Sequence, residues 1–478
     1  MKNITKNQYL ITIDFFRYLP SRFYVISNIL LILPFFSKML SVKEMGIFQI
    51  GISMLNLVCT IFFDWISKIV LRYYDENKLK NELNEFFTNI FILFIFNYIL
   101  LIIIYFLFGE TLCNSLHTDK LTILSVMIVV IPCLVRQFLY QMLRLLNKTV
   151  LYTTSIVIYQ ILLISITMLL INYCSNKVTA IFFAMAIAIT IIDIYIIKRI
   201  SKKISFRLSK YKNELINKFL KYGIPLVCTN FFIWNIINYN KYFYRSAGDF
   251  NATGEIALAA FLTTSILSSI FSTLLFAIFP RIVKRYATKR NIKPFLTDTV
   301  KIYIVYFLPL TMIFCLFPKN ILDIFSNNQY TSTLYLLPFF AISIFLHELG
   351  KIINIKYHLA NKNYIDTLIA LISGAICIIL TGIFNKYLGI IGTASAMLVG
   401  FILWITINSI IKCNNERYIS WPNVFKTLIC STIICIAAYF IVINFTTSNN
   451  GIQQVIQMLA YMAICYFILF EFKKFILE

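Results

Sequence analysis

Two adjacent titratable side chains, His347 and Glu348, lie in the middle of a long apolar stretch, residues 332–355. A histidine and a carboxylate are costly to bury at membrane depth, and a histidine changes its charge near neutral pH. The pair is therefore a candidate for carrying a coupling proton. The alternative is that both line a cavity and bond to its substrate or to Lys351, close by on the same helix.

Two further carboxylates in apolar stretches are candidates for ion coupling. Asp64 is followed four residues later by Lys68, so the alternative reading is an ion pair on one helix face. Asp193 lies in the segment IIDIYIIK, near the end of its stretch. Because a carboxylate within a membrane span is expensive, each is a functional hypothesis in its own right.

Basic side chains also lie within these stretches or at their edges. A cation that faces lipid is costly, so each is expected to face a water-filled cavity or to extend to the membrane surface. Arg22 and Arg136 are the deepest cations of the first half, and Lys241 lies late in the seventh stretch. We predict that all three line a cavity. For Arg17 and Lys356 the surface remains the alternative. The predicted cationic set comprises Arg17, Arg22, Arg136, Lys241, Lys351 and Lys356.

The elements that must position these residues are transmembrane helices. The chain of 478 residues is 60% hydrophobic and only 13% charged. It contains roughly fourteen apolar stretches of about 20 residues, each long enough to cross a bilayer as a helix. We predict an all-α polytopic membrane protein with spans at 18–38, 46–68, 88–109, 121–143, 150–172, 178–197, 219–243, 254–280, 298–317, 332–355, 364–384, 389–411, 424–444 and 454–472.

The net charge of +23 fits this topology. Roughly thirty of the 43 Lys and Arg fall in alternate loops and termini, as the positive-inside rule requires of cytoplasmic segments. This pattern explains the basic charge without nucleic acid as a partner. Because the number of spans is even, both termini are expected in the cytoplasm, with the protein embedded in membrane lipids.

No enzymatic or cofactor motif is present. The sequence has no Gly-rich phosphate loop, metal-ligand cluster or nucleophile elbow. We therefore expect no catalytic residues, no metal and no cofactor. The 11 Cys form no CxxC pair. Cys113 and Cys174 fall in predicted outer loops, and the sequence leaves open whether they pair.

A weak internal repeat divides the chain. Gly46 and Gly254 open the second and eighth spans, where we expect tight turns, and Arg72 and Arg281 end them at similar intervals. Six spans separate the two units, which suggests two six-helix bundles with one orientation. The predicted organisation is an N-terminal bundle at 1–200, a basic cytoplasmic linker at 201–218, a C-terminal bundle at 219–412 and two additional helices at 413–478.

Three blocks resemble a known family. The first, MLSVKEMGIFQIGISML followed by WISKIVLRYYDE, covers 39–76, and the second, FLKYGIPLVCTNFFIWNIINYNKYFYRSAGDFNATGEIALAAFL to FPRIVKRY, covers 219–286. The third, with YHLANKNYIDTL and GIIGTASAMLVG, covers 357–404. Together they resemble the Wzx-type polysaccharide and O-antigen flippases of the multidrug/oligosaccharidyl-lipid/polysaccharide exporter superfamily.

The resemblance implies a function. Such proteins move undecaprenyl-diphosphate-linked oligosaccharide repeat units across the bacterial inner membrane by alternating access, for O-antigen or capsular polysaccharide. Cations in the cavity would bind the diphosphate. A polysaccharide polymerase and a chain-length regulator are the partners implied. The family commonly has an Asp-Arg pair in the seventh span, where this chain has Asn240-Lys241, so a role that needs that acid cannot be carried over.

Two other functions remain open. A cation-coupled small-molecule or multidrug exporter of the same superfamily is the first, although the charges within the spans are mostly basic here. A membrane enzyme that polymerises or transfers sugars is the second. Such an enzyme normally has a long outer loop with catalytic residues, and no predicted outer loop here is long enough.

Overall fold

The computed structural model is helical throughout the residues that it describes, and no strand occurs among them. This confirms the predicted fold class, an all-α polytopic membrane protein. The residues described are 35–36, 39–115, 118–146, 148–174, 176–200, 211–271, 292–325, 332–360, 362–412, 419–445 and 451–471, with positions 274, 275, 278, 282, 285 and 330.

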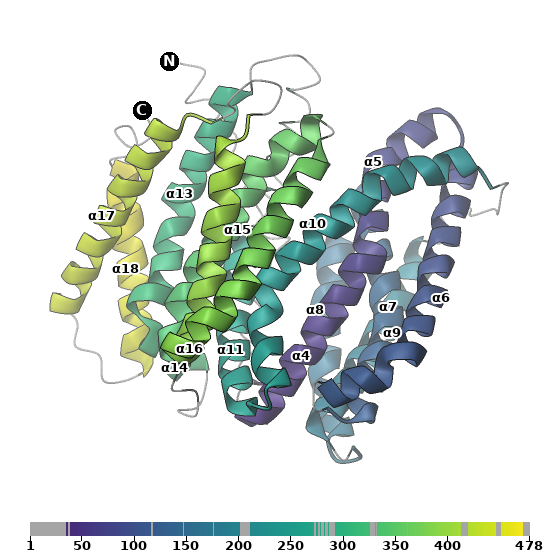
Figure 1. Ribbon diagram of the computed structural model, residues 1–478, viewed down its shortest axis with the longest axis horizontal. Helices are drawn as coiled ribbons and strands as arrows, with labels where there is room; N and C mark the ends of the chain where they lie inside the picture. Colours follow the sequence, from purple (N-terminus) through teal and green to yellow (C-terminus); the bar gives the residue numbers. More distant parts are fainter. Residues whose placement is uncertain are drawn as a thin grey trace. The chain divides into compact units, whose positions relative to one another are not determined.

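The chain forms two compact units (Figure 1). One is Leu40–Ala257, and the other comprises Met1–Met39 with Leu258–Glu478. The first contains α4 (Val42–Cys59), η3 (Thr60–Asp64), α5 (Trp65–Leu79), α6 (Leu83–Ser115), α7 (Lys120–Leu145), α8 (Thr149–Leu170), α9 (Lys177–Ile200), α10 (Asn213–Ser246) and the start of α11 (Phe250–Thr263). The second continues with η4 (Thr264–Ser268), α13 (Lys293–Leu316), α14 (Pro318–Phe325), α15 (Thr333–Ala360), α16 (Asn363–Ile410), α17 (Trp421–Phe445) and α18 (Gly451–Glu471).

Twelve helices of the described part are long and apolar enough to cross a membrane. They correspond to predicted spans from the second onward, while most of the first span, 18–38, lies outside the described residues. The predicted count of fourteen therefore stays a prediction. The short helix α14 was not predicted from the sequence, because its eight residues are too few to cross a membrane.

Helix α16 accounts for two predicted spans, 364–384 and 389–411. A straight helix of its 48 residues would be about 72 Å long, more than twice the apolar thickness of a bilayer. The chain instead reverses at Gly389, whose φ of 57° lies in the left-handed region that glycine tolerates. The reversal is tight, since a Cβ at Gly392 would come within 2.2 Å of the Phe384 carbonyl oxygen. Helix α16 is thus a hairpin of two limbs.

The core of the unit at Leu40–Ala257 is built on small side chains. Ala180, Ala184 and Ala188 recur every four residues on one face of α9 and are completely buried. Helix α9 packs on both α7 and α8. Small residues at such an interface let helix backbones approach closely. This close packing holds the helices together, because the hydrophobic effect does not favour helix association within lipid.

The first turns of α4 and α11 cross at two glycines. A Cβ at Gly46 would lie 3.2 Å from the Gly254 nitrogen, and one at Gly254 would lie 2.2 Å from the carbonyl oxygen of Val42. The predicted tight turns at these glycines are wrong, because both residues lie inside helices. Their use is to let two helix backbones touch. Helix α4 starts at a capping box in which Ser41 and Glu44 bond reciprocally.

Both π-helical turns interrupt corresponding spans of the predicted repeat. Turn η3 follows α4 in the second span, and η4 follows α11 in the eighth. A π-turn inserts an extra residue into a helix and often occurs at functional sites. Asp64 is the last residue of η3 and Ser268 is the last residue of η4.

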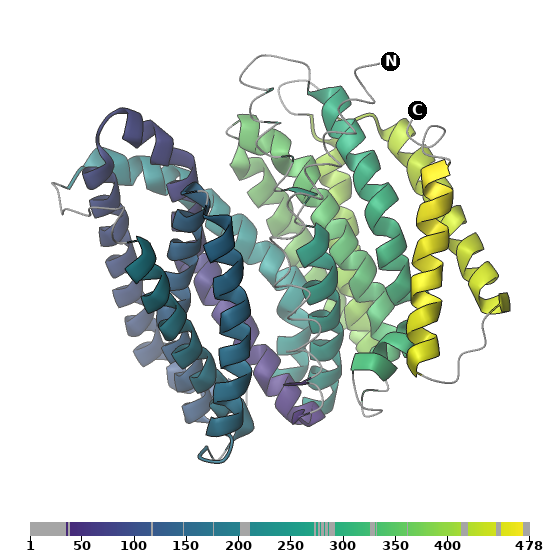
Figure 2. The same cartoon turned by 180° about the vertical axis from the view of Figure 1, so that it is seen from behind.

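The second unit packs its helices around α13 and α15. Helix α13 contacts α15, α17 and α18, and α15 contacts both α13 and α16. Figure 2 shows α17, drawn in yellow-green, beside α18, drawn in yellow. Tyr303 of α13 is buried against Phe271 and Phe345, and its hydroxyl donates to the Phe345 carbonyl at 2.8 Å. The predicted division into bundles at 1–200 and 219–412 stays a prediction.

Cys113 and Cys174 are both free thiols. The structure therefore contains no disulfide between them.

Candidate functional site

Lys241 is a buried cation with no acidic partner among the described residues. It lies near the C-terminal end of α10 and is only 5% exposed. No carboxylate among the described residues forms an ion pair with it. Its neighbour Asn240 is completely buried, and neither its amide nitrogen nor its amide oxygen has a hydrogen-bond partner in the described part of the chain. The two residues leave donor capacity for a ligand, which a polar group with several oxygens would satisfy.

A polar contact with α4 fixes this part of α10. The hydroxyls of Tyr242 and Ser53 are 3.0 Å apart, and the indole N–H of Trp234 donates to the Ser53 carbonyl at 3.2 Å. The rings of Trp234 and Tyr242 are also in contact, with centroids 5.4 Å apart. These contacts set the rotation of α10 and therefore the position of Lys241.

Arg245 lies one turn beyond Lys241 and is completely buried. Its guanidinium stacks on the ring of Phe250, 4.2 Å from the ring centre, and the Lys43 amine lies 4.7 Å from the same centre. A cation in the last turn of α10 is favoured by the helix dipole. Asp119 is the acidic residue that acts on Arg245 electrostatically. The end of α10 is thus strongly basic.

The structure brings Arg136 and Asp193 together, although they are far apart in the sequence. The Arg136 guanidinium of α7 stacks on Tyr159 of α8, 4.6 Å from the ring centre, and contacts the Cys133 sulfur at 3.6 Å. Asp193 of α9 is buried, both of its oxygens lack a donor in the described part of the chain, and Arg136 acts on it electrostatically. Asp193 is thus a buried carboxylate among apolar helices, and the charged side chain that acts on it is partly buried.

Asp64 is held by its own helical segment. The Thr60 hydroxyl donates to its carboxylate at 3.4 Å, and Lys68 is its charged neighbour. The predicted proximity of Asp64 to Lys68 therefore agrees with the structure.

His347 and Glu348 form a polar network with Lys351 and Ser268. The Ser268 hydroxyl donates to Glu348 Oε1 at 2.6 Å, and the Lys351 amine donates to the same oxygen at 2.7 Å. His347 Nδ1 lies 3.7 Å from that oxygen, and its ring packs against Phe401 and Trp404. Turn η4 brings Ser268 to α15, a contact that helical spacing could not reveal. The expected Glu348–Lys351 interaction is present.

Lys356 of α15 donates hydrogen bonds to backbone carbonyl groups at the end of α16. Its amine donates to the carbonyl oxygens of Asn408 and Ile411 at 2.5 and 2.8 Å, where the helix ends. Lysine is favoured at this position because the last carbonyls of a helix have no internal donors. Arg17 and Arg22 lie outside the described residues.

The sequence reasoning missed Asp366. Its carboxylate accepts hydrogen bonds from Asn354 at 2.6 Å and from the Trp404 indole at 3.2 Å, and it is only 7% exposed. The residue lies in the first turn of α16, where an acidic residue is ordinary because it favours the helix dipole. Only the fold-back of α16 shows that this carboxylate is buried between helices.

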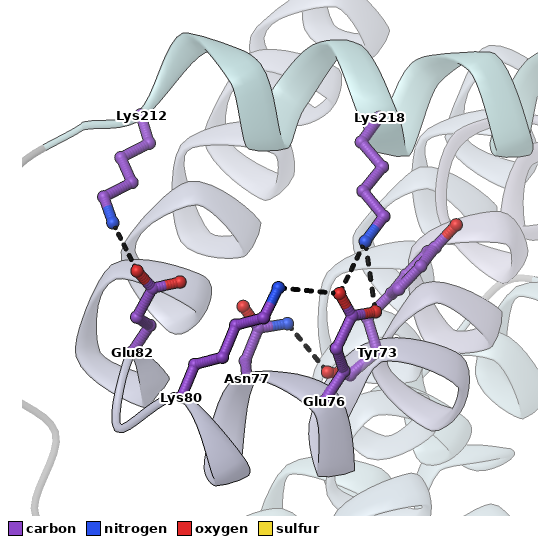
Figure 3. Close-up of polar contacts among 7 residues, drawn as sticks. All are labelled: Tyr73, Glu76, Asn77, Lys80, Glu82, Lys212 and Lys218. Carbon is purple, nitrogen blue, oxygen red and sulfur yellow. Dashed lines mark hydrogen bonds and ion pairs between the residues drawn. The ribbon is translucent and has the colours of Figure 1, made fainter.

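A second charged cluster lies outside the spans (Figure 3). Lys218 donates to both oxygens of Glu76 at 3.0 and 3.1 Å and stacks on Tyr73, and Lys80 also pairs with Glu76 at 3.0 Å. Nearby, Lys212 pairs with Glu82 at 2.9 Å and with Glu85. The cluster ties the start of α10 to the end of α5 and the start of α6.

The pairing shifts the titration of these groups. Hydrogen bonds from Lys218 and then Lys80 lower the pKa of Glu76, and a hydrogen bond from Lys212 lowers the pKa of Glu82. Hydrogen bonds to Glu82 and Glu85 raise the pKa of Lys212 to about 12. The carboxylate contributions are therefore present at neutral pH and are lost as the pH falls through the lowered values. The Lys212 contribution is lost only as the pH rises through about 12.

We expect Glu76→Gln to lower stability only slightly, by ~0.2–1 kcal/mol, since the pair is solvent-exposed. The measurement is the thermal midpoint in detergent at neutral pH and again at low pH. The difference between wild type and variant should disappear only when the pH falls below the lowered pKa of Glu76, where the carboxylate is protonated in both folded and unfolded protein. A difference that persists at low pH would assign the effect to packing and not to charge.

In the described part of the chain, no group of three His, Cys, Asp or Glu side chains is placed to hold a metal ion. The charged groups offer anion binding and proton transfer instead. Helices long enough to span a membrane and buried cations between them are typical of membrane transporters.

Comparison with known proteins identifies the family of this chain. The family model described as polysaccharide biosynthesis protein matches residues 23–286, more than half of the chain, and the chain belongs to this family. No curated protein sequence matches the chain at a significant level.

The fold is similar to several solved transporters. One is a lipid II flippase, MurJ, in an inward closed conformation, with a TM-score of 0.65, 17% identity and coverage of 98% of this chain and 100% of that one. Another is a multidrug resistance MATE family transporter of the MOP superfamily. Its inward-facing form has a TM-score of 0.61, 13% identity and coverage of 84% and 92%. A structure described as the outward-facing conformation of such a transporter has a TM-score of 0.61 and 13% identity. The match covers 85% of this chain and 94% of that one. At these identities the likeness shows the fold.

Proposed function

We propose that the protein is a flippase for undecaprenyl-diphosphate-linked oligosaccharide repeat units. It moves the charged headgroup across the inner membrane by alternating access, for assembly of O-antigen or capsular polysaccharide. Family membership and the MurJ-like fold support this proposal. Both termini would face the cytoplasm, and the cationic set would bind the diphosphate. A polysaccharide polymerase would take up the product, under a chain-length regulator.

The observation that carries the proposal is Lys241 beside Asn240. Burying an ammonium group that has no carboxylate partner among the described residues costs free energy. This cost indicates that Lys241 has a functional role. A diphosphate supplies the missing negative charge, and its oxygens would also accept from the orphaned Asn240 amide. Arg136, Lys351 and the undescribed Arg17 and Arg22 extend the proposed cationic set. The backbone contacts of Lys356 give it the weakest claim.

Coupling to an ion gradient would use titratable groups at membrane depth. His347 and Glu348 support it best. The Glu348 carboxylate contacts Ser268, Lys351 and His347, and the strength of these three interactions depends on whether the carboxylate is protonated. Asp193 supports it because neither of its oxygens has a hydrogen-bond donor in the described part of the chain. Asp64 is the weaker candidate because Thr60 and Lys68 already surround it.

The deciding experiment is the pool of lipid-linked sugars in a deletion strain of the native host. Accumulation of repeat units on the cytoplasmic face, with loss of surface polysaccharide that the intact gene restores, is the expected result. Normal surface polysaccharide with raised sensitivity to cationic drugs would instead support a multidrug exporter, the alternative that the MATE-like fold favours. Repeat units that reach the outer face but are not joined would indicate a polymerase.

A further inference from the structure

Asp366, Asn354 and Asn408 form a buried polar group near the ends of α15 and α16. They are 7%, 3% and 0% exposed, respectively. Asp366 lies in the first turn of α16, Asn408 lies in its last turn, and Asn354 comes from α15. The hairpin at Gly389 brings the two limbs together, so that residues 42 positions apart meet at one point.

Among the described residues, the hydrogen-bond donors to the carboxylate of Asp366 are neutral. Oδ1 accepts from the Asn354 amide and the Trp404 indole, and the Asn408 side chain interacts with the same carboxyl group. Lys356 of α15 is the charged side chain that acts on it, but its amine is bonded to two backbone carbonyls of α16. The second limb of α16 contributes an indole and an amide. No salt bridge to Asp366 occurs among the described residues.

The same group holds two buried acceptors without donors. Neither Asn354 Oδ1 nor Asn408 Oδ1 has a hydrogen-bond partner in the described part of the chain. Leaving a buried acceptor unsatisfied costs about 1–3 kcal/mol. If the second carboxyl oxygen of Asp366 carried a proton, its O–H group would be a donor for the amide oxygen of Asn354 or of Asn408. Burial away from water also disfavours the charged form of a carboxyl group.

We propose that Asp366 is a proton-binding site, with the proton held on its second carboxyl oxygen, Oδ2, and shared with the amide oxygen of Asn354 or Asn408. The proton comes from water when the site opens and returns to water when it is released. That its uptake and release help to drive transport rests on the flippase function proposed above. The proton binding itself does not.

Trp404 provides a local reporter of this proton. Its indole N–H donates to Asp366 Oδ1 at 3.2 Å, so a change in the charge of the carboxyl group changes the field at the ring. The chain has 4 Trp. Replacing Trp65, Trp234 and Trp421 by Phe leaves Trp404 as the single fluorophore. His347 is a second titratable neighbour, with its ring centre 6.1 Å from that of Trp404, so it needs its own control.

The test is the fluorescence of purified protein with Trp404 alone, followed from about pH 5 to about pH 9. We expect one titration, which Asp366→Asn abolishes and which His347→Gln and Glu348→Gln retain. Asp366→Asn keeps the shape and the acceptor oxygen, and its thermal midpoint shows whether it folds. In reconstituted vesicles, the same variant should make headgroup transport independent of the pH gradient.

Three results would overturn the proposal. The first is the absence of any titration in this range, and the second is a titration that disappears in His347→Gln or Glu348→Gln but survives in Asp366→Asn. The third is a response to Na⁺ at constant pH and ionic strength that depends on Asp366, which would assign the site to a metal cation. Because the fluorescence assay contains no glycolipid, its failure leaves the flippase function untouched, and failure of the flippase test leaves the titration standing.

Discussion

Gly254→Ala is expected to destabilise the protein markedly. The new methyl group would lie 2.2 Å from the backbone carbonyl oxygen of Val42 and 2.6 Å from its Cγ1. A backbone oxygen cannot rotate away, so the first turns of α4 and α11 must separate. Overpacking of this kind costs about 1–3 kcal/mol or more and exceeds the gain of about 1 kcal/mol in helix propensity. We expect the thermal midpoint in detergent to fall by about 1–3 °C.

Two other glycines serve as matched controls. A methyl group at Gly46 meets Gly254 at 3.2 Å, which a small shift can relieve, and one at Gly382 has no neighbour within 4 Å. The thermal midpoint should therefore decrease in the order Gly382→Ala, Gly46→Ala, Gly254→Ala. Equal midpoints for Gly254→Ala and Gly382→Ala would show that the crossing of α4 and α11 is not close-packed in the native protein.

Lys241→Met is expected to separate stability from function. Methionine retains the length of the side chain and removes a buried charge that has no described acidic partner. Replacing a buried charge by an apolar group of similar volume is often neutral or stabilising, by about 1–4 kcal/mol. Headgroup transport should nevertheless fall by about tenfold or more, because a charge-assisted hydrogen bond to the diphosphate is worth about 1.5–3 kcal/mol. Thermal midpoint and transport in vesicles are measured on the same preparation.

The controls for this experiment are Lys241→Arg and Lys221→Met. Arginine keeps the charge and should retain part of the transport, whereas Lys221 is an exposed lysine of the same helix whose loss should change neither quantity. Full transport in Lys241→Met would remove Lys241 from the proposed site. A strong loss of stability would show that the ammonium has a structural partner.

The class of protein and the positions of its helices followed from the sequence. A run of about 20 apolar residues has few alternatives in a bilayer, since only a helix satisfies its own backbone hydrogen bonds there. The predicted spans from 46 onward therefore coincide with helices such as α6, α9 and α13. Local pairs were also predictable, as at Glu348 and Lys351, because residues three or four apart share a helix face.

Contacts between helices were not predictable, because the apolar pattern of a span does not encode its neighbours. Gly46 and Gly254 are consistent with turns in the sequence, and only the crossing of α4 and α11 shows their role in packing. Asp366 looks like an ordinary residue in a first helical turn until the reversal at Gly389 places Trp404 and Asn408 beside it. Ser268 reaches Glu348 through a π-turn that no helical periodicity predicts. Hydrophobicity thus decides which segments enter the membrane, while close packing and the pairing of buried polar groups decide how these segments meet.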